Sequence, residues 1–191
     1  ATYNFADGWP TQVFSAGALS MTNVIRLMRT RPWWNCIPDT NHATVTSGFG
    51  TYGAVKYVTC MREVTGKTAI AYLPSGTLTP TVNLARISGP SANAWWYDPR
   101  NGAATAIGNF TTIGTQKFTP PDTNDWVLVR DDSSLNLPPP GVTVLQPATL
   151  TINSLGNQQF RLTITGTPGQ PYSLTSTTNL NSIWQPLTTG T

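Results

Sequence analysis

Carboxylate side chains, which could cleave a glycosidic bond if two of them faced each other, are scarce in this chain. Its 191 residues include one glutamate, Glu63, and seven aspartates. Glycosidic cleavage needs two carboxyl groups roughly 5 to 9.5 Å apart. Glu63 precedes Thr65-Gly66-Lys67, a hairpin turn signal, so we expect an exposed surface carboxylate. Asp122 and Asp125 lie in a loop with proline and asparagine, where a role in the turn is favoured.

Metal-binding and nucleophilic arrangements have equally little support. Asp131-Asp132 ends a predicted strand, and its oxygens could bind Ca²⁺ together with nearby carbonyls. A solvated strand end is the interpretation we favour. His42 is the only histidine, so neither a Ser-His-Asp triad nor a zinc site with its usual Cys/His spacing is supported. We therefore predict no catalytic residue, no metal and no cofactor in this chain.

Adjacent aromatic residues provide the one signal for binding. Trp33-Trp34 and Trp95-Trp96-Tyr97 lie in segments predicted to be extended, where neighbouring side chains point to opposite faces. One ring of each pair should lie in the core, and the other should be half-exposed or covered by a neighbouring element. An exposed tryptophan could stack on a sugar ring, but packing of both pairs against residues 15–31 is the simpler alternative. The candidate ligand-binding residues are Trp96, Trp34, Tyr97 and Arg100.

The two cysteines, Cys36 and Cys60, leave two alternatives open. A disulfide between them would form in an oxidising compartment. Two buried free thiols that act as small hydrophobic side chains fit the sequence equally well. Two cysteines define no disulfide framework, so the sequence does not decide between these alternatives.

The composition is that of a folded protein rich in strands. Only 10% of the residues are charged, against about 25% in an average globular protein. The 16 glycines, the 16 prolines and the many threonines suit short strands joined by turns. The net charge of +3 is small and its basic residues are scattered, which disfavours a nucleic-acid-binding surface. No apolar run approaches the roughly 18 residues that a membrane-spanning helix needs.

The N-terminus does not resemble a targeting segment. No basic region followed by an apolar region marks a signal peptide. The chain begins at Ala1 without a methionine. We expect it to be a mature or excised piece of a longer protein.

One helix is predicted, from Ser15 to Thr30. Its apolar residues recur at spacings of three and four, which places them on one face. Ser15 can cap the start, and Pro32 prevents continuation past Arg31. The predicted buried face consists of Ala18, Met21, Val24, Ile25 and Met28.

Strands dominate after the glycine-rich segment 47–53. Asp98 to Gly102 should form a turn, because proline fixes φ and Asn-Gly accepts positive φ. Pro80 favours an edge position for the strand that contains it. The predicted strands are 55–64, 68–73, 78–84, 92–97, 103–110, 116–119 and 126–130, spaced as in a β-sandwich.

The last third of the chain should form a second unit. Three consecutive prolines within residues 133–141 indicate an extended linker between two packed units. A β pattern restarts at residue 142, with too few strands for a complete sandwich of about seven. The candidate strands are 142–145, 150–152, 160–164, 172–176 and 184–187.

An ordered set of motifs in residues 15–132 resembles the family described as a putative collagen-binding domain of a collagenase. In that family the module usually follows a (β/α)8 barrel of the apiosidase-like glycoside hydrolase group. Residues 17–39 resemble the last barrel helix and its exit. The barrel strands with the catalytic carboxylates are absent, so the resemblance implies no catalytic residue here. The motifs of the module are 67–74, 87–90, 95–102, 107–108, Phe110, 118–121 and 125–129.

Residues 142–191 are similar to the immunoglobulin-like or fibronectin-like C-terminal modules of secreted bacterial proteins. Such modules normally continue past the point where this chain stops, so the resemblance implies a partial module. The segments that carry this resemblance are 160–162, 166–172, 176–180 and 184–187.

We therefore predict a mostly β protein, in which an antiparallel β-sandwich module with one short N-terminal helix precedes a smaller, partial immunoglobulin-like β-module. The predicted function is that of a non-catalytic accessory module of a secreted carbohydrate-active protein, extracellular or at the cell surface, that contacts polysaccharide or a matrix polymer. The alternative is a structural subunit of an extracellular filament or surface layer, a homo-oligomer assembled by pairing of open strand edges. The predicted domains are residues 1–39 (helix segment), 40–132 (sandwich), 133–141 (linker) and 142–191 (partial module).

Overall fold

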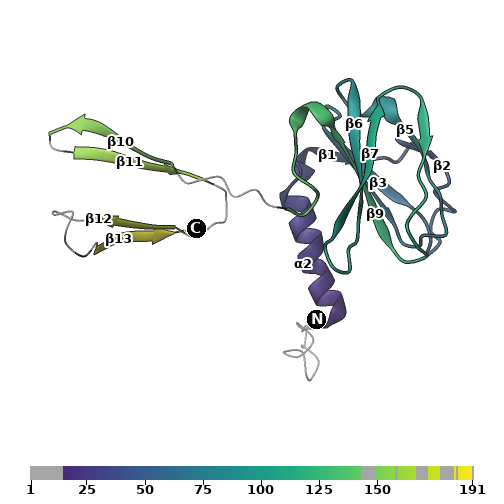
Figure 1. The fold of residues 1–191 in the computed structure, drawn as a ribbon, viewed down its shortest axis with the longest axis horizontal. Helices are drawn as coiled ribbons and strands as arrows, with labels where there is room; N and C mark the ends of the chain where they lie inside the picture. Colours follow the sequence, from purple (N-terminus) through teal and green to yellow (C-terminus); the bar gives the residue numbers. More distant parts are fainter. Residues whose placement is uncertain are drawn as a thin grey trace, which may run out of the picture. The chain divides into compact units, whose positions relative to one another are not determined.

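The computed structural model describes residues 15–142, 149–157, 159–166, 172–176, 183 and 185–190. The chain divides into two compact units, residues 1–143 and 144–191. Parts of the predicted strands 142–145 and 184–187 lie outside the described residues. The fold is mostly β, with antiparallel sheets and one α-helix in the part of the chain that is described (Figure 1).

The helix α2 (Ala16–Arg29) begins at the predicted residue and buries part of the predicted face. The Ser15 side chain accepts a hydrogen bond from the backbone N–H of Ala18 at the N-cap, as expected. Ala18, Val24 and Met28 are half-buried, whereas Met21 and Ile25 are exposed. The fully buried residues are Leu27 and Asn23, and the prediction missed Asn23 because it is polar. Its side chain is buried by donating to the carbonyl of Pro99, and its own carbonyl accepts from the Tyr97 hydroxyl.

Two antiparallel sheets face each other in the first unit. One has six strands in the order β1-β3-β4-β9-β6-β7, and the other has three in the order β2-β5-β8. Short 3-10 turns occur at η1 (Trp33–Asn35), η2 (Leu84–Arg86) and η3 (Ser133–Leu135). The six strands are β1 (Cys36–Pro38), β3 (Thr59–Glu63), β4 (Thr68–Leu73), β9 (Trp126–Asp132), β6 (Ser91–Tyr97) and β7 (Ala104–Thr111), and the three are β2 (Val45–Ser47), β5 (Thr81–Asn83) and β8 (Thr115–Lys117).

Two details of the strand prediction were wrong. The predicted strand 55–64 is shorter, because only Thr59–Glu63 pairs with a neighbour and residues 51–58 form turns. The strand after Pro80 lies at the centre of the three-stranded sheet, not at an edge. Pro80 precedes β5 and accepts a bond from the backbone N–H of Phe118 with its carbonyl, so its missing N–H breaks no ladder.

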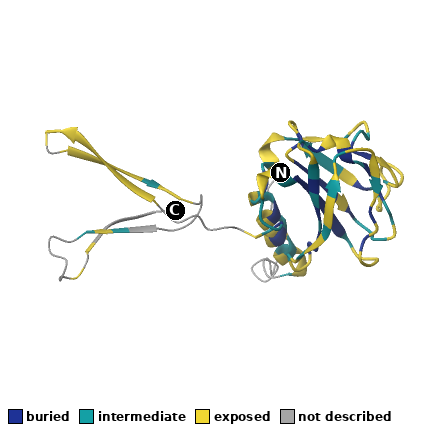
Figure 2. Cartoon of the chain, turned by 45° about the horizontal axis from the view of Figure 1, so that its top comes forward, coloured by how far each residue is buried: buried dark blue, intermediate teal, exposed yellow. Residues whose placement is uncertain are grey.

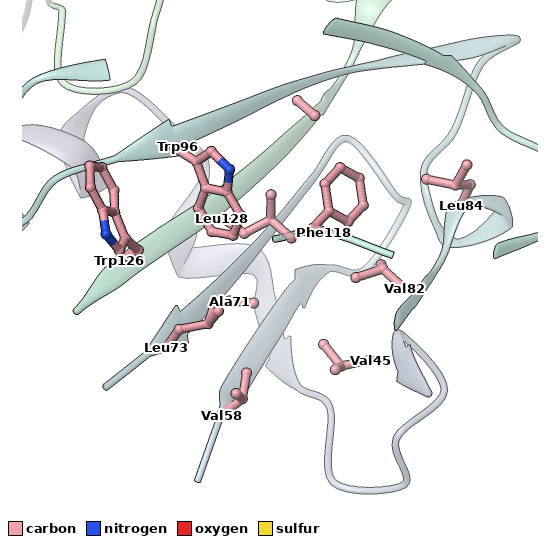
Figure 3. Close-up of a cluster of buried hydrophobic side chains, with 11 residues drawn as sticks. Val45, Val58, Ala71, Leu73, Val82, Leu84, Trp96, Phe118, Trp126 and Leu128 are labelled. Atoms are coloured by element: carbon pink, nitrogen blue, oxygen red, sulfur yellow. The ribbon is translucent and has the colours of Figure 1, made fainter. Parts of the chain in front are cut away.

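The six-stranded sheet is buried on both faces, because its central strands place apolar side chains alternately on one face and on the other. Trp96, Trp126 and Leu128 face the three-stranded sheet and form the larger core with Val45 and Val82 (Figure 3). On the opposite face, the smaller core joins the helix to the sheet. It consists of Leu27, Ile70, Tyr97, Val127 and Val129.

Several charged residues predicted at the surface are buried. Glu63 is 1% exposed, and its carboxylate accepts bonds from the Thr65 backbone N–H, the Thr65 hydroxyl and the Lys67 N–H. Asp131 and Asp132 are also buried, so the predicted solvated strand end is wrong. Asp132 accepts from the hydroxyls of Ser88 and Ser134. These carboxylates are stable inside the protein because each is supplied with hydrogen bonds.

Residues 133–142 pack on the first unit. The carbonyl of Pro138 accepts from the Arg31 guanidinium at 2.9 Å, and the Gly141 N–H donates to the Thr30 hydroxyl at 3.2 Å. Pro140 is buried. The segment predicted to be a linker is thus held against the C-terminal end of α2, and the division between the two units follows residue 143.

The second unit contains two antiparallel hairpins. One pairs β10 (Thr149–Gly156) with β11 (Gln159–Thr165), and the other pairs β12 (Tyr172–Ser176) with β13 (Gln185–Gly190). The side chains of the first hairpin are almost all exposed (Figure 2). The immunoglobulin-like character of this unit stays a prediction.

Candidate functional site

Trp96 and Tyr97, two of the four predicted ligand-binding residues, are buried. Trp96 is 5% exposed and packs edge-to-face on Trp126, with ring centroids 6.3 Å apart. Tyr97 is fully buried on the other face of the sheet, where its hydroxyl donates to the Asn23 carbonyl at 2.6 Å. The expected exposure of Trp96 is wrong, because this face of β6 meets the second sheet. Neither ring is accessible to a ligand.

Trp34, the third predicted residue, lies at the surface. Trp33 and Trp34 form the 3-10 turn η1 and not an extended segment, so both rings point outward. The exposed fraction of Trp34 is 67%, and the two rings meet edge-to-face with centroids 6.5 Å apart. The expectation that one of these rings lies in the core is therefore wrong.

Arg100, the fourth predicted residue, is held by acidic neighbours. Its Nε and Nη2 atoms donate to the two carboxylate oxygens of Asp98 at 2.7 and 2.9 Å. Asp122 and Asp125 lie 3.8 and 4.0 Å away, and the guanidinium carbon lies 5.4 Å from the ring centre of Trp126. The hydrogen bonds to Asp98 raise the pKa of Arg100. The side chain therefore closes the 98–102 turn over the edge of the core.

The two cysteines are free thiols in the structure. Cys36 pairs with Glu63 across β1 and β3, whereas Cys60 pairs with Ala71 across β3 and β4. By this register the two residues lie about three positions apart along the strands, roughly 10 Å, which is beyond the reach of a disulfide. Of the two alternatives, the structure contains the free thiols.

An aromatic pocket lies beside the end of β1 and the start of β3. The His42 and Phe49 rings stack at 3.8 Å with an angle of 5° between their planes. Tyr57 stands edge-on to both rings, and its hydroxyl lies 3.2 Å from His42 Nε2. Tyr52 is 86% exposed and meets Tyr57 at 5.4 Å and 83°. The pocket has a volume of about 500 Å³ and is lined by Pro38, Asp39, Thr40, His42, Val45, Tyr52, Tyr57, Val58, Thr59 and Cys60.

Local hydrogen bonds shape the loop that carries these rings. The carboxylate of Asp39 accepts from the backbone N–H groups of Thr44 and Val45, which folds residues 39–45 into a tight turn. His42 has a φ of 53°, a left-handed conformation that this turn supports. The Val58 N–H donates to the Phe49 carbonyl at 2.8 Å and closes the glycine-rich segment. Gly48 also has positive φ, and a Cβ there would collide with the carbonyl of Thr79.

The pocket is equipped for binding. It offers flat apolar rings, two hydroxyl-bearing threonines and the Tyr57–His42 pair, whereas Asp39 is the only carboxylate that lines it. One carboxylate does not supply the acid–nucleophile pair of a glycosidase. Sequence reasoning missed this site. Its only signal was the interleaving of Phe49, Tyr52 and Tyr57 with glycines beside the sole histidine.

Two kinds of feature are absent from the described residues. No group of three or more His, Cys, Asp or Glu side chains there could hold a metal ion. No helix in that part of the chain is both long and apolar enough to cross a membrane.

Solved structures that resemble this chain include two glycoside hydrolases. One is a glycoside hydrolase family 5 protein from Bacteroides vulgatus ATCC 8482, with 26% sequence identity and a TM-score of 0.58. The other is described as a glycoside hydrolase, with 27% identity and a TM-score of 0.57. The matches cover 67% and 69% of this chain, but the chain spans only 27% and 29% of the two solved chains. No curated protein matches the chain.

The family comparison falls on the part of the chain that contains the pocket. Residues 38–131 match the model of the family described as a putative collagen-binding domain of a collagenase. That segment holds most of both sheets and every residue that lines the aromatic pocket. The matched family is thus one of binding domains, and this chain resembles it over residues 38–131.

Proposed function

We propose that this chain is a non-catalytic accessory module of an extracellular carbohydrate-active protein, and that its aromatic pocket binds a polysaccharide. The observation that carries the proposal is the placement of Tyr52 and Tyr57 around an open cavity of about 500 Å³. Cavities of this size, with apolar walls and a few polar groups, are typical of small-ligand sites. Aromatic rings bind the apolar faces of sugars, and the neighbouring hydroxyls orient them.

The comparisons support this proposal at a coarser level. The matched family is a binding domain, and the two solved proteins are glycoside hydrolases with additional chain beyond the matched part. A preceding apiosidase-like barrel stays a prediction. Nothing in the described residues favours assembly into a filament, so we do not propose that alternative.

Retention of the 191-residue chain in native gels that contain soluble polysaccharides tests the proposal. We expect at least one polysaccharide to retard the chain, and Tyr52→Ala to weaken binding about two- to tenfold, since one aromatic stacking contact is worth roughly 0.5–1.5 kcal/mol. Ile113→Ala is the control, because it removes an exposed apolar side chain that does not line the pocket. Absence of retardation by every polysaccharide tested would contradict the proposed function.

A further inference from the structure

We infer that the aromatic pocket selects an uncharged polysaccharide and takes it as a single chain, rather than as the flat face of an ordered polymer. This inference rests on the proposed function and specifies its ligand. Two features of the pocket carry it, namely the orientation of its rings and the distribution of its charges.

The exposed rings do not form a plane. Tyr52 and Tyr57 are nearly perpendicular, at 83°, and their centroids lie 5.4 Å apart. The stacked His42–Phe49 pair is again nearly perpendicular to Tyr57, at 82° and 77°. A flat polymer face needs coplanar rings to contact all of them at once. Perpendicular rings instead form the walls of a corner, which one sugar chain can enter with its apolar faces against both walls.

The charges of the pocket disfavour an acidic sugar. Asp39 is the only carboxylate that lines the cavity, and no lysine or arginine lines it. A uronate or sulfate group would therefore meet a carboxylate with no cation to pair with. Arg130 is buried on the face of β9 that meets the three-stranded sheet, donates to the Asn83 carbonyl at 3.3 Å, and does not line the pocket. It is out of reach of a ligand's acid group.

The remaining polar groups suit hydroxyls. Two backbone N–H groups already donate to the Asp39 carboxylate, which leaves further lone pairs to accept from a sugar hydroxyl. The exposed side chains of Thr40 and Thr59 can both donate and accept. These contacts need no charge on the ligand.

Polysaccharides that share a backbone and carry either uncharged or acidic substituents provide the test. Hydroxyethyl cellulose and carboxymethyl cellulose share a backbone, as do arabinoxylan and glucuronoxylan, and each pair is compared by affinity electrophoresis with the full chain. In the pair whose backbone binds, we expect the charged member to bind about fivefold more weakly at low salt, the effect of roughly 1 kcal/mol of repulsion. High salt should narrow this gap, because it screens repulsion and leaves stacking unchanged. Tyr52→Ala should weaken binding to the uncharged member about two- to tenfold, and Ile113→Ala, which removes an exposed side chain outside the pocket, should leave it unchanged.

The outcomes separate this inference from the proposed function. Equal or tighter binding of the charged member, still weakened in Tyr52→Ala, would overturn the inference and leave the proposed function standing. Retention on microcrystalline cellulose without retention by soluble chains would overturn the single-chain mode. Binding to collagen or gelatin but to no polysaccharide would overturn both the inference and the polysaccharide assignment.

Discussion

Arg31 and Asp131, a hundred residues apart in the sequence, form a buried bidentate ion pair. The Nε–Oδ1 and Nη2–Oδ2 distances are 2.8 and 2.7 Å, and the exposed fractions of the two side chains are 0% and 3%. The Thr68 hydroxyl also donates to Asp131, and Arg31 donates to the Pro138 carbonyl. The pair therefore joins the end of α2, strands β4 and β9, and residues 133–142. Segments on both sides of the matched range 38–131 belong to the same packed unit.

Removal of this ion pair should strongly destabilise the first unit. Arg31→Met leaves the Asp131 carboxylate buried with only the Thr68 hydroxyl, and we expect a loss of about 3–5 kcal/mol in the free energy of unfolding. Arg29→Ala, an exposed arginine in the same turn of the helix, should change it by less than about 0.5 kcal/mol. Urea denaturation followed by tryptophan fluorescence measures both. Similar effects of the two variants would contradict the structural role of the pair.

Trp96 and Trp34 should respond in opposite ways to truncation. Trp96→Ala removes a ring from the larger core and should cost about 3–5 kcal/mol. Trp34→Ala removes a ring that is 67% exposed, and we expect a change within about 0.5 kcal/mol. Thermal unfolding monitored by circular dichroism provides the comparison. A loss of stability in Trp34→Ala as large as that in Trp96→Ala would show that η1 packs differently.

The two thiols should differ in their reaction with alkylating reagents. Burial raises the pKa of the Cys60 thiol to about 12, and burial together with the nearby Glu63 carboxylate also raises that of Cys36. Since the thiolate is the reactive form, both should react slowly near pH 8, and Cys60 more slowly than Cys36. Iodoacetamide labelling followed by peptide mass spectrometry measures the two rates. Recovery of a Cys36–Cys60 cross-linked peptide under non-reducing conditions would contradict the structure.

The stability of the first unit should fall in acid. Burial by itself raises the pKa of Glu63, but the hydrogen bonds from Thr65 and Lys67 outweigh burial and lower it below its ordinary value. The pKa of Asp132 is lowered in the same way, because hydrogen bonds from Ser134 and Ser88 outweigh the effect of burial. A carboxyl whose pKa is lower in the folded state stabilises the fold above its unfolded pKa, and this contribution is lost as the pH falls through the folded pKa.

The free energy of unfolding, measured at a series of pH values from neutral downward, should therefore be constant above about pH 5 and should decline below about pH 4. Glu63→Gln should be less stable at neutral pH, because a neutral amide accepts these bonds more weakly, and its decline in acid should be shallower. An unchanged acid slope in this variant would show that Glu63 does not contribute to the decline.

Local features were predicted correctly because they depend on residues close together in the sequence. The Ser15 cap, the Thr65-Gly66-Lys67 hairpin and the turn from Asp98 to Gly102 each formed as expected. The alternation of Trp95, Trp96 and Tyr97 across the sheet also follows from strand geometry alone. The sequence thereby determined a mostly β fold with one helix.

The tertiary structure decided which side of each element is covered, and no local pattern contains that information. Asn23 is buried because Pro99 and Tyr97 supply its partners, and Asp131 is buried because Arg31 does. The same limit applies to the aromatic pocket. The single histidine gave no functional signal in the sequence. Its ring lines the candidate pocket because the Asp39 turn and the Phe49 loop bring it onto Phe49 and beside Tyr57, and the linear order does not specify such contacts between rings.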